Sequence, residues 1–166
     1  MPIHLIWGDD YEACNREIEE LIQAVIDPSW KSFNYSQIDG NDPKQNLRAL
    51  EEAQSPPLGS GSRIVLVRRS PFCNGCSIEL GNKLEQVIKS IPDKTYLILS
   101  NSHKPDKRLK TTKLIQKSIE SNTFSLEKSF TLPLPWDING QRNLVMNSLK
   151  RLNLKMNYET IDLIVE

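Results

Sequence analysis

Three groups of residues have types and spacings that are associated with chemistry. The turn at Gly8-Asp9-Asp10 lies between a short apolar run and a helical pattern, where a nucleotide-binding fold has its phosphate-binding loop. Cys73 and Cys76 form a CxxC pair, a spacing that is used in metal and redox sites. The third group is a basic segment that contains Lys104, Lys107, Arg108 and Lys110. Each group suggests a different class of function.

The turn at residues 8–10 lacks what a phosphate-binding loop requires. The pattern GxxxxGK[ST] uses glycine for close backbone approach and lysine for the phosphate charge. Counting from Gly8, those places hold Ala13, Cys14 and Asn15. Carboxylates within residues 9–12 also stand at the start of the predicted helix, where they would repel a phosphate. We therefore expect no nucleotide at this turn.

The third apolar run has cations where a magnesium site needs acids. A Walker B strand ends in acidic residues that hold Mg²⁺. Here the run at 64–67 is followed by Arg68 and Arg69, which would repel the metal. Both halves of an ATP site are thus missing, and no GxSxG or HExxH motif is present. The sequence predicts a chain that is not an enzyme by itself and uses no cofactor.

The CxxC pair lacks partners for a metal or redox site. Zinc needs about four ligands, and no second cysteine pair exists; His4 falls in a predicted strand and His103 in a loop. A thioredoxin-like site needs the pair at a strand-to-helix junction with an activated thiolate, whereas this pair lies in a loop with an Asn-Gly turn. We expect Cys73 and Cys76 to be unligated surface thiols.

Composition indicates an ordinary globular protein. The chain has 166 residues, of which 38% are hydrophobic and 25% charged. No apolar run is long enough to cross a membrane, and the start lacks the pattern of a signal peptide, so a cytoplasmic location is expected. Residues 1–60 carry 4 basic and 11 acidic side chains, while residues 61–166 carry 17 and 10. This asymmetry suits either nucleic acid or charged protein partners.

Short apolar runs alternate with helical periods, which is typical of βαβ units. The predicted strands cover 3–7, 33–38, 64–67, 96–99 and 123–130, the last at a sheet edge. Predicted helices cover 11–26, 43–53 and about 80–91, and a basic loop and helix cover 104–121. The fold class is therefore α/β, with a five-stranded, mostly parallel sheet and helices on its faces.

The pattern changes after residue 132. Residues 132–135 read Leu-Pro-Leu-Pro, a linker. Asp137 then caps one helix and Asn157 a second, short one, which we expect to be frayed or held only by crystal or partner contacts. The predicted domains are 1–132, the α/β domain, and 133–166, a linker with an incomplete helical domain. Two helices this short cannot bury a core, so a fragment of a longer protein is expected.

Together these motifs resemble a known family. The Gly8-Asp9-Asp10 start, the Pro-Leu loop before the third strand, and residues 101–110 after the fourth are similar to the delta-subunit family of bacterial DNA polymerase III, the clamp-loader subunit that opens the sliding clamp. The resemblance covers the whole chain but about half of a full-length delta subunit. It implies a P-loop NTPase-like (AAA+-like) module without a functional nucleotide site, followed by the start of a small helical lid domain.

The resemblance also implies a clamp contact and partners. Family members contact the clamp through an apolar wedge between the second helix and the third strand, a place held here by Pro57, Leu58 and Gly59. Leu58 fits the first wedge position, whereas Gly59 departs from the second, which is usually a large aromatic. The implied role is an accessory, non-enzymatic subunit of the DNA polymerase holoenzyme. Its partners would be the sliding clamp, other clamp-loader subunits and, through the complex, DNA, with no membrane partner.

Other interpretations stay open at the level of sequence. Lys104, Lys107, Arg108 and Lys110 are either contacts to DNA phosphates or a partner, or a solvated helix face. The chain as a whole is alternatively a degenerate P-loop-like interaction domain with another partner, or a nucleotide-dependent enzyme with an atypical site.

Overall fold

The computed structural model describes residues 2–165 and contains one five-stranded sheet. Its strands are β1 (Ile3–Trp7), β2 (Tyr35–Asp39), β3 (Arg63–Arg68), β4 (Thr95–Asn101) and β5 (Leu126–Ser129). The spatial order is β2-β3-β4-β1-β5, and every neighbouring pair is parallel. The α/β class and the edge position of the last strand are as predicted from sequence.

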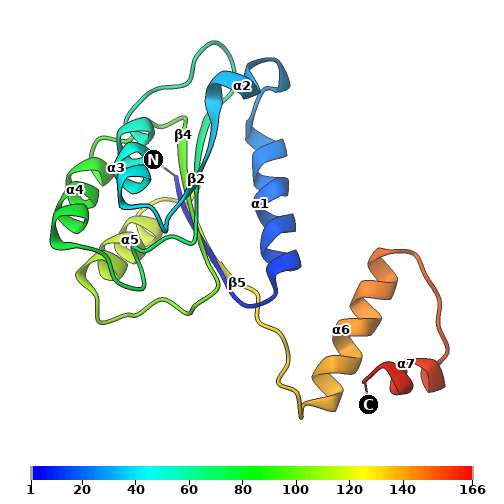
Figure 1. Cartoon of the computed structure of the whole chain (residues 1–166). Helices are drawn as coiled ribbons and strands as arrows, with labels where there is room; N and C mark the ends of the chain where they lie inside the picture. Colours follow the sequence, from blue (N-terminus) through cyan, green and yellow to red (C-terminus); the bar gives the residue numbers. More distant parts are fainter. Residues whose placement is uncertain (1, 166) are drawn as a thin grey trace. The chain divides into compact units, whose positions relative to one another are not determined.

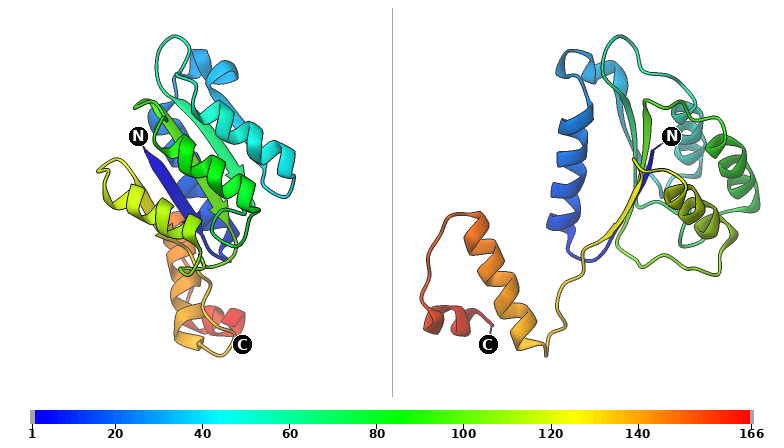
Figure 2. Two further views of the ribbon diagram at one scale, coloured as in Figure 1. Left: turned by 90° about the vertical axis from the view of Figure 1, so that its left-hand side faces the viewer. Right: turned by 180° about the vertical axis from the view of Figure 1, so that it is seen from behind.

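Helices cover both faces of this sheet (Figures 1 and 2). Those of the sheet-containing unit are α1 (Tyr11–Val25), α2 (Lys31–Asn34), α3 (Pro43–Ala53), α4 (Ile78–Ile88) and α5 (Lys110–Glu120). Helix α1 packs on one face, and α3, α4 and α5 pack on the other. This layering follows from right-handed βαβ connections, in which each crossover helix returns the chain to a parallel strand.

Each face of the sheet has its own apolar core. The first core joins one face of the sheet to α3, α4 and α5 and contains the fully buried Phe72 and Leu84. The second joins the other face to α1 and contains Ile6, Ile18 and Leu66, which are also fully buried. Because strand side chains alternate between faces, a strand buried on both sides reads as a continuous apolar run, as residues 64–67 do.

Side-chain N-caps are present at the starts of two predicted helices, α1 and α3. The Asp10 carboxylate accepts a hydrogen bond from the Ala13 N–H at 2.9 Å at the start of α1. Asp42 accepts from the Lys44 N–H at 2.9 Å, with Pro43 in the first turn of α3. These side chains satisfy backbone donors that a helix leaves unpaired at its amino end.

The structure corrects the prediction of a strand over 33–38. Residues 28–30 form a 3₁₀ turn and residues 31–34 form α2, so β2 begins only at Tyr35. Asp27 starts the turn by accepting from the Ser29 N–H at 2.9 Å, with proline next to it. The alternation of Phe33 and Tyr35 imitated a strand, but Phe33 is exposed on α2.

A second compact unit begins at Thr131, next to the boundary predicted at residue 132. It contains α6 (Ile138–Arg151), capped by Asp137 as predicted, and α7 (Tyr158–Val165). Contacts within this unit support the final helix: Asn157 accepts from the Thr160 N–H at 2.9 Å, Ile161 is buried, and Asp162 forms an ion pair with Arg142 on α6. Within residues 2–165, no helix is long and apolar enough to cross a membrane.

Candidate functional site

The loop between α3 and β3 presents Leu58 to solvent. The loop lies at the amino end of β3, beside α2 (Figure 1). Leu58 is 51% exposed and belongs to neither core of the sheet. Its side chain is therefore free of its own domain's core, as a contact for a partner requires.

The backbone of Leu58 is held by the buried side chain of Asn34. The Asn34 amide nitrogen donates to the Leu58 carbonyl oxygen at 2.8 Å, and the Leu58 N–H donates to the Asn34 amide oxygen at 2.8 Å. At the base of the loop, the Thr95 hydroxyl donates to the Ser55 carbonyl oxygen at 2.9 Å. An exposed apolar side chain on a fixed backbone loses little conformational freedom when a partner binds it.

Replacing Asn34 with alanine should lower the free energy of unfolding by about 2 kcal/mol, because the Leu58 N–H and carbonyl both lose their partner. We also expect faster hydrogen exchange at the Leu58 amide. Denaturant titration and amide exchange by NMR measure the two effects. Asn82→Ala is the matched control, since Asn82 is exposed on α4. Unchanged exchange at Leu58 in Asn34→Ala would show that the loop is held by other contacts.

Gly59 has no room for a side chain. Its φ of 65° lies in the left-handed region that favours glycine. A Cβ atom at this position would overlap the indole ring of Trp30. The large aromatic residue that the resemblance leads one to expect here cannot fit this backbone, because Trp30 already fills the space.

A polar pocket of about 640 Å³ lies at the carboxyl ends of the strands, where open α/β sheets bind ligands. The backbone donors of the turn at its edge are occupied within the chain. The Gly8 N–H donates to the Asn101 carbonyl at 3.0 Å, and the Asp10 N–H donates to the Phe130 carbonyl at 3.1 Å. The N–H groups that cradle phosphate in a P-loop are therefore unavailable at these two positions.

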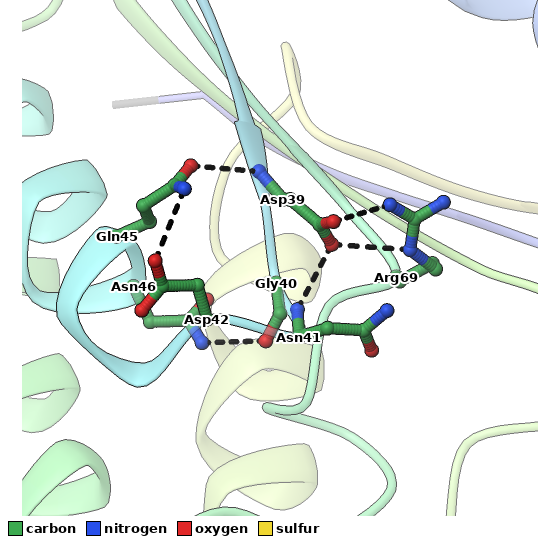
Figure 3. Close-up of polar contacts among 7 residues, drawn as sticks. All are labelled: Asp39, Gly40, Asn41, Asp42, Gln45, Asn46 and Arg69. Atoms are coloured by element: carbon green, nitrogen blue, oxygen red, sulfur yellow. Dashed lines mark hydrogen bonds and ion pairs between the residues drawn. The ribbon is translucent and has the colours of Figure 1, made fainter.

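The two arginines that follow β3 are also engaged within the chain. Arg69 forms a forked ion pair with Asp39 at the end of β2, which lowers the pKa of the Asp39 carboxyl (Figure 3). Arg68 donates to the side chain of Asn15 on α1. Asn46 fixes the adjoining turn by donating to the Gly40 carbonyl at 2.6 Å (Figure 3). Cations with local partners thus stand where a magnesium site would need carboxylates.

The basic segment lies at the other end of the sheet from Leu58, because it follows β4 whereas the Leu58 loop precedes the parallel β3. The structure therefore does not bring the two predicted sites together. Arg108 pairs with Asp106 at 2.8 Å, which lowers the pKa of that carboxyl to about 2, and Lys110 pairs with Glu85 at 2.7 Å. Lys104 and Lys107 are exposed, and no ion pair involving them occurs within residues 2–165.

The prediction that both cysteines of the CxxC pair are surface thiols is wrong. Cys73 is buried in the first core, and Cys76 is half-buried beside it. Burial raises the pKa of the Cys73 thiol to about 11 and also raises that of Cys76, which is the opposite of thiolate activation. Within residues 2–165, no group of three or more His, Cys, Asp or Glu side chains is placed to hold a metal ion.

Comparison with known proteins assigns the family. Residues 4–127 match the family described as DNA polymerase III, delta subunit. The chain belongs to this family. The match runs from the second residue of β1 to the start of β5 and includes the Leu58 loop, the turn at Gly8 and the basic segment.

Solved structures add the fold of this delta-family chain. The Bacillus subtilis DNA clamp loader delta protein is similar with a TM-score of 0.71 and 21% identity, over 99% of this chain and 48% of that chain. A DNA polymerase III gamma subunit-related protein from Thermotoga maritima has a TM-score of 0.45 and 13% identity, over 96% of this chain and 51% of that one. No curated protein sequence matches the chain. The chain thus spans about half the length of the B. subtilis protein, whose fold it shares over that half.

Sequence reasoning missed three residues of the loop region, Trp30, Phe33 and Asn34. It assigned residues 33–38 to a strand, in which alternate side chains face the sheet core. The signal that could have found them is Asp27-Pro28, an N-cap followed by proline, which starts a helical turn. No sequence pattern predicts the contact between Asn34 and Leu58, because the two residues are 24 positions apart in the chain.

Proposed function

We propose that this delta-family chain binds the sliding clamp through Leu58 and its loop and helps to hold the clamp interface open during DNA replication. The other clamp-loader subunits, rather than this chain, would bind and hydrolyse ATP. The proposal makes the chain an accessory subunit of the replicative DNA polymerase, acting in the cytoplasm.

The observation that carries the proposal is the pairing of an exposed Leu58 side chain with a fixed Leu58 backbone. The bonds to Asn34 fix the backbone of the loop at Leu58 and leave the side chain 51% exposed. Proline at 56 and 57 further limits the loop's freedom before binding. Such preorganisation favours a role in binding over one in folding.

The absence of ATP turnover by this chain is supported by the geometry at the strand ends. Two N–H donors of the turn at Gly8 are bonded to carbonyls of the chain, and Arg68 and Arg69 occupy the end of β3. Binding a nucleotide would require breaking these bonds and bringing a phosphate beside the acidic residues 9–12.

DNA is proposed only as a contact made through the complex. Of the four predicted basic residues, Arg108 and Lys110 form exposed ion pairs with neighbouring carboxylates, which compete with other anions for them. Lys104 and Lys107 remain available to bind phosphates or an acidic partner surface. Two cations give only weak, salt-dependent binding.

Replacing Leu58 with alanine should reduce clamp affinity by roughly 1.5–3 kcal/mol, about one to two decades in Kd, because the buried apolar contact is lost. The fold should persist, since Leu58 lies outside both cores. Titration of the purified clamp by calorimetry measures the affinity, and thermal melts verify folding.

Ile78→Ala is the matched control, because Ile78 is an exposed aliphatic residue, 84% exposed, at the start of α4. We expect this variant to bind the clamp as wild type does. Wild-type affinity in Leu58→Ala would refute the contact proposed for this loop. An early melt of Leu58→Ala would instead show that Leu58 serves the fold.

A further inference from the structure

Two exposed aromatic rings lie next to the Leu58 loop. Trp30 is 37% exposed and Phe33 is 59% exposed, and their ring centroids are 6.0 Å apart at a tilt of 54°. Neither ring belongs to either core of the sheet. Aromatic side chains of this size are enriched among the residues that dominate binding energy at protein interfaces.

Three contacts join these rings and the Leu58 loop into one surface. Asn34, the residue after Phe33, holds the Leu58 backbone with two hydrogen bonds of 2.8 Å. Gly59 lies against the Trp30 indole so closely that no side chain could stand between them. One position further, the Ser60 hydroxyl bonds to the Asp27 carboxylate, which also caps the turn that carries Trp30.

We propose that Trp30 and Phe33 form, together with Leu58, a single apolar docking surface for the sliding clamp. This inference rests on the clamp-binding function proposed above and adds to it the residues that lie outside the loop. Trp30 and Phe33 provide the aromatic surface that Gly59 lacks. The small residue at 59 is then a condition for the contact, because it lets the indole approach the loop.

The clamp is the occupant because the surface is continuous. Gly59, next to Leu58 in the chain, packs on Trp30, and Trp30 packs on Phe33, so a protein that covers Leu58 also meets these rings. Hydrogen bonds hold the backbone at Leu58 and at the turn that carries Trp30, so both segments of the patch have a fixed backbone. The partner must therefore have an apolar recess wide enough for an aliphatic and an aromatic side chain at once.

The test is a clamp titration with Phe33→Ala beside Leu58→Ala and the control Phe124→Ala. Phe124 is 73% exposed in the turn before β5, and β5 lies at the opposite edge of the sheet from β2. We expect Phe33→Ala to weaken clamp binding about tenfold or more, and Phe124→Ala to leave it unchanged. Thermal melts of all variants accompany the titration.

A second readout leaves the side chains of the proposed surface intact. With Trp7 and Trp136 replaced by phenylalanine, Trp30 is the remaining tryptophan, and saturating clamp should at least halve the acrylamide quenching of its fluorescence. Normal binding by Phe33→Ala with unchanged quenching, while Leu58→Ala binds weakly, would overturn this inference and leave the proposed function standing. Normal binding by both alanine variants would overturn both.

Discussion

Replacing Gly8 with alanine is expected to lower the free energy of unfolding by about 4 kcal/mol or more, among the larger effects of single substitutions. Gly8 has a φ of 144°, which L side chains rarely adopt. A Cβ atom there would overlap the carbonyl oxygen of Phe130. That carbonyl accepts from the Asp10 N–H at 3.1 Å, and the Phe130 N–H donates to the Trp7 carbonyl at 2.9 Å. Relief of the overlap must disturb the junction between β1 and the end of β5.

Gly75→Ala is the matched control for this prediction. Gly75 has a φ of 119°, so alanine carries a similar backbone penalty. A Cβ atom at this position would have no neighbouring atom within 4 Å. We expect a loss of about 1–3 kcal/mol from backbone strain alone. Denaturant titration of both variants measures the difference, which isolates the collision with Phe130. Equal losses would mean that the segment at Phe130 shifts without an energetic cost and that Gly8 is needed only for its dihedral angle.

Acidification from pH 7 to pH 4 should lower the free energy of unfolding through His4 by about 3 kcal/mol. His4 lies on β1, is 2% exposed and stacks on Tyr96 with ring centroids 5.6 Å apart, and neither ring nitrogen has a hydrogen-bond partner among residues 2–165. Burial lowers its pKa from 6.5 to about 4, Glu17 opposes this shift and Lys128 adds to it.

The direction of the effect follows from which state binds the proton. Above pH 6.5 the imidazole is mostly neutral in both the folded and the unfolded state, so its titration hardly changes the free energy of unfolding. Between pH 6.5 and 4 the unfolded chain binds a proton that the folded chain does not, so stability falls over this window and levels off below it. Carboxyls with lowered pKa, such as Asp106, lose their own contribution toward lower pH and must be subtracted.

The variants His4→Phe and His4→Gln separate the contribution of His4 to the pH dependence of stability from that of the carboxyls. Both variants lack the titrating group, and only phenylalanine keeps a ring against Tyr96. Denaturant titrations at pH 7, 5.5 and 4 should show that wild type loses about 3 kcal/mol more than either variant. Parallel pH profiles of wild type and both variants would show that His4 titrates alike in the folded and unfolded chain.

The α/β class was readable from sequence because the local signals agreed with the fold. Residues 64–67 form a continuous apolar run that only a strand buried on both faces needs, and Asp42-Pro43 is a helix start that local hydrogen bonding alone explains. The prediction that this chain binds no nucleotide also rests on local features. Residues 8–15 and 68–69 lack side chains that phosphate and Mg²⁺ chemistry requires, whatever the tertiary structure.

The candidate binding surface was only partly readable. Sequence indicated Leu58 through the composition of its loop and through the family resemblance, but it placed Phe33 in a strand and gave Trp30 no role. The local alternation of apolar residues fits a strand and a single helical turn equally well over so few positions. The Asp27 cap and the packing of Trp30 on Gly59 decide between them, and both depend on residues brought close by folding.

Sequence by itself thus indicated the α/β class, the start of α3 and the exposed leucine, because each depends on residue types at short spacing. Tertiary structure alone decided that Cys73 is buried, that Arg108 and Lys110 are paired, and that Trp30 lies against both Phe33 and Gly59. The reason is physical. Burial, ion pairing and surface continuity depend on distances between segments, and parallel βαβ topology sets those distances by joining strands that are far apart in the chain.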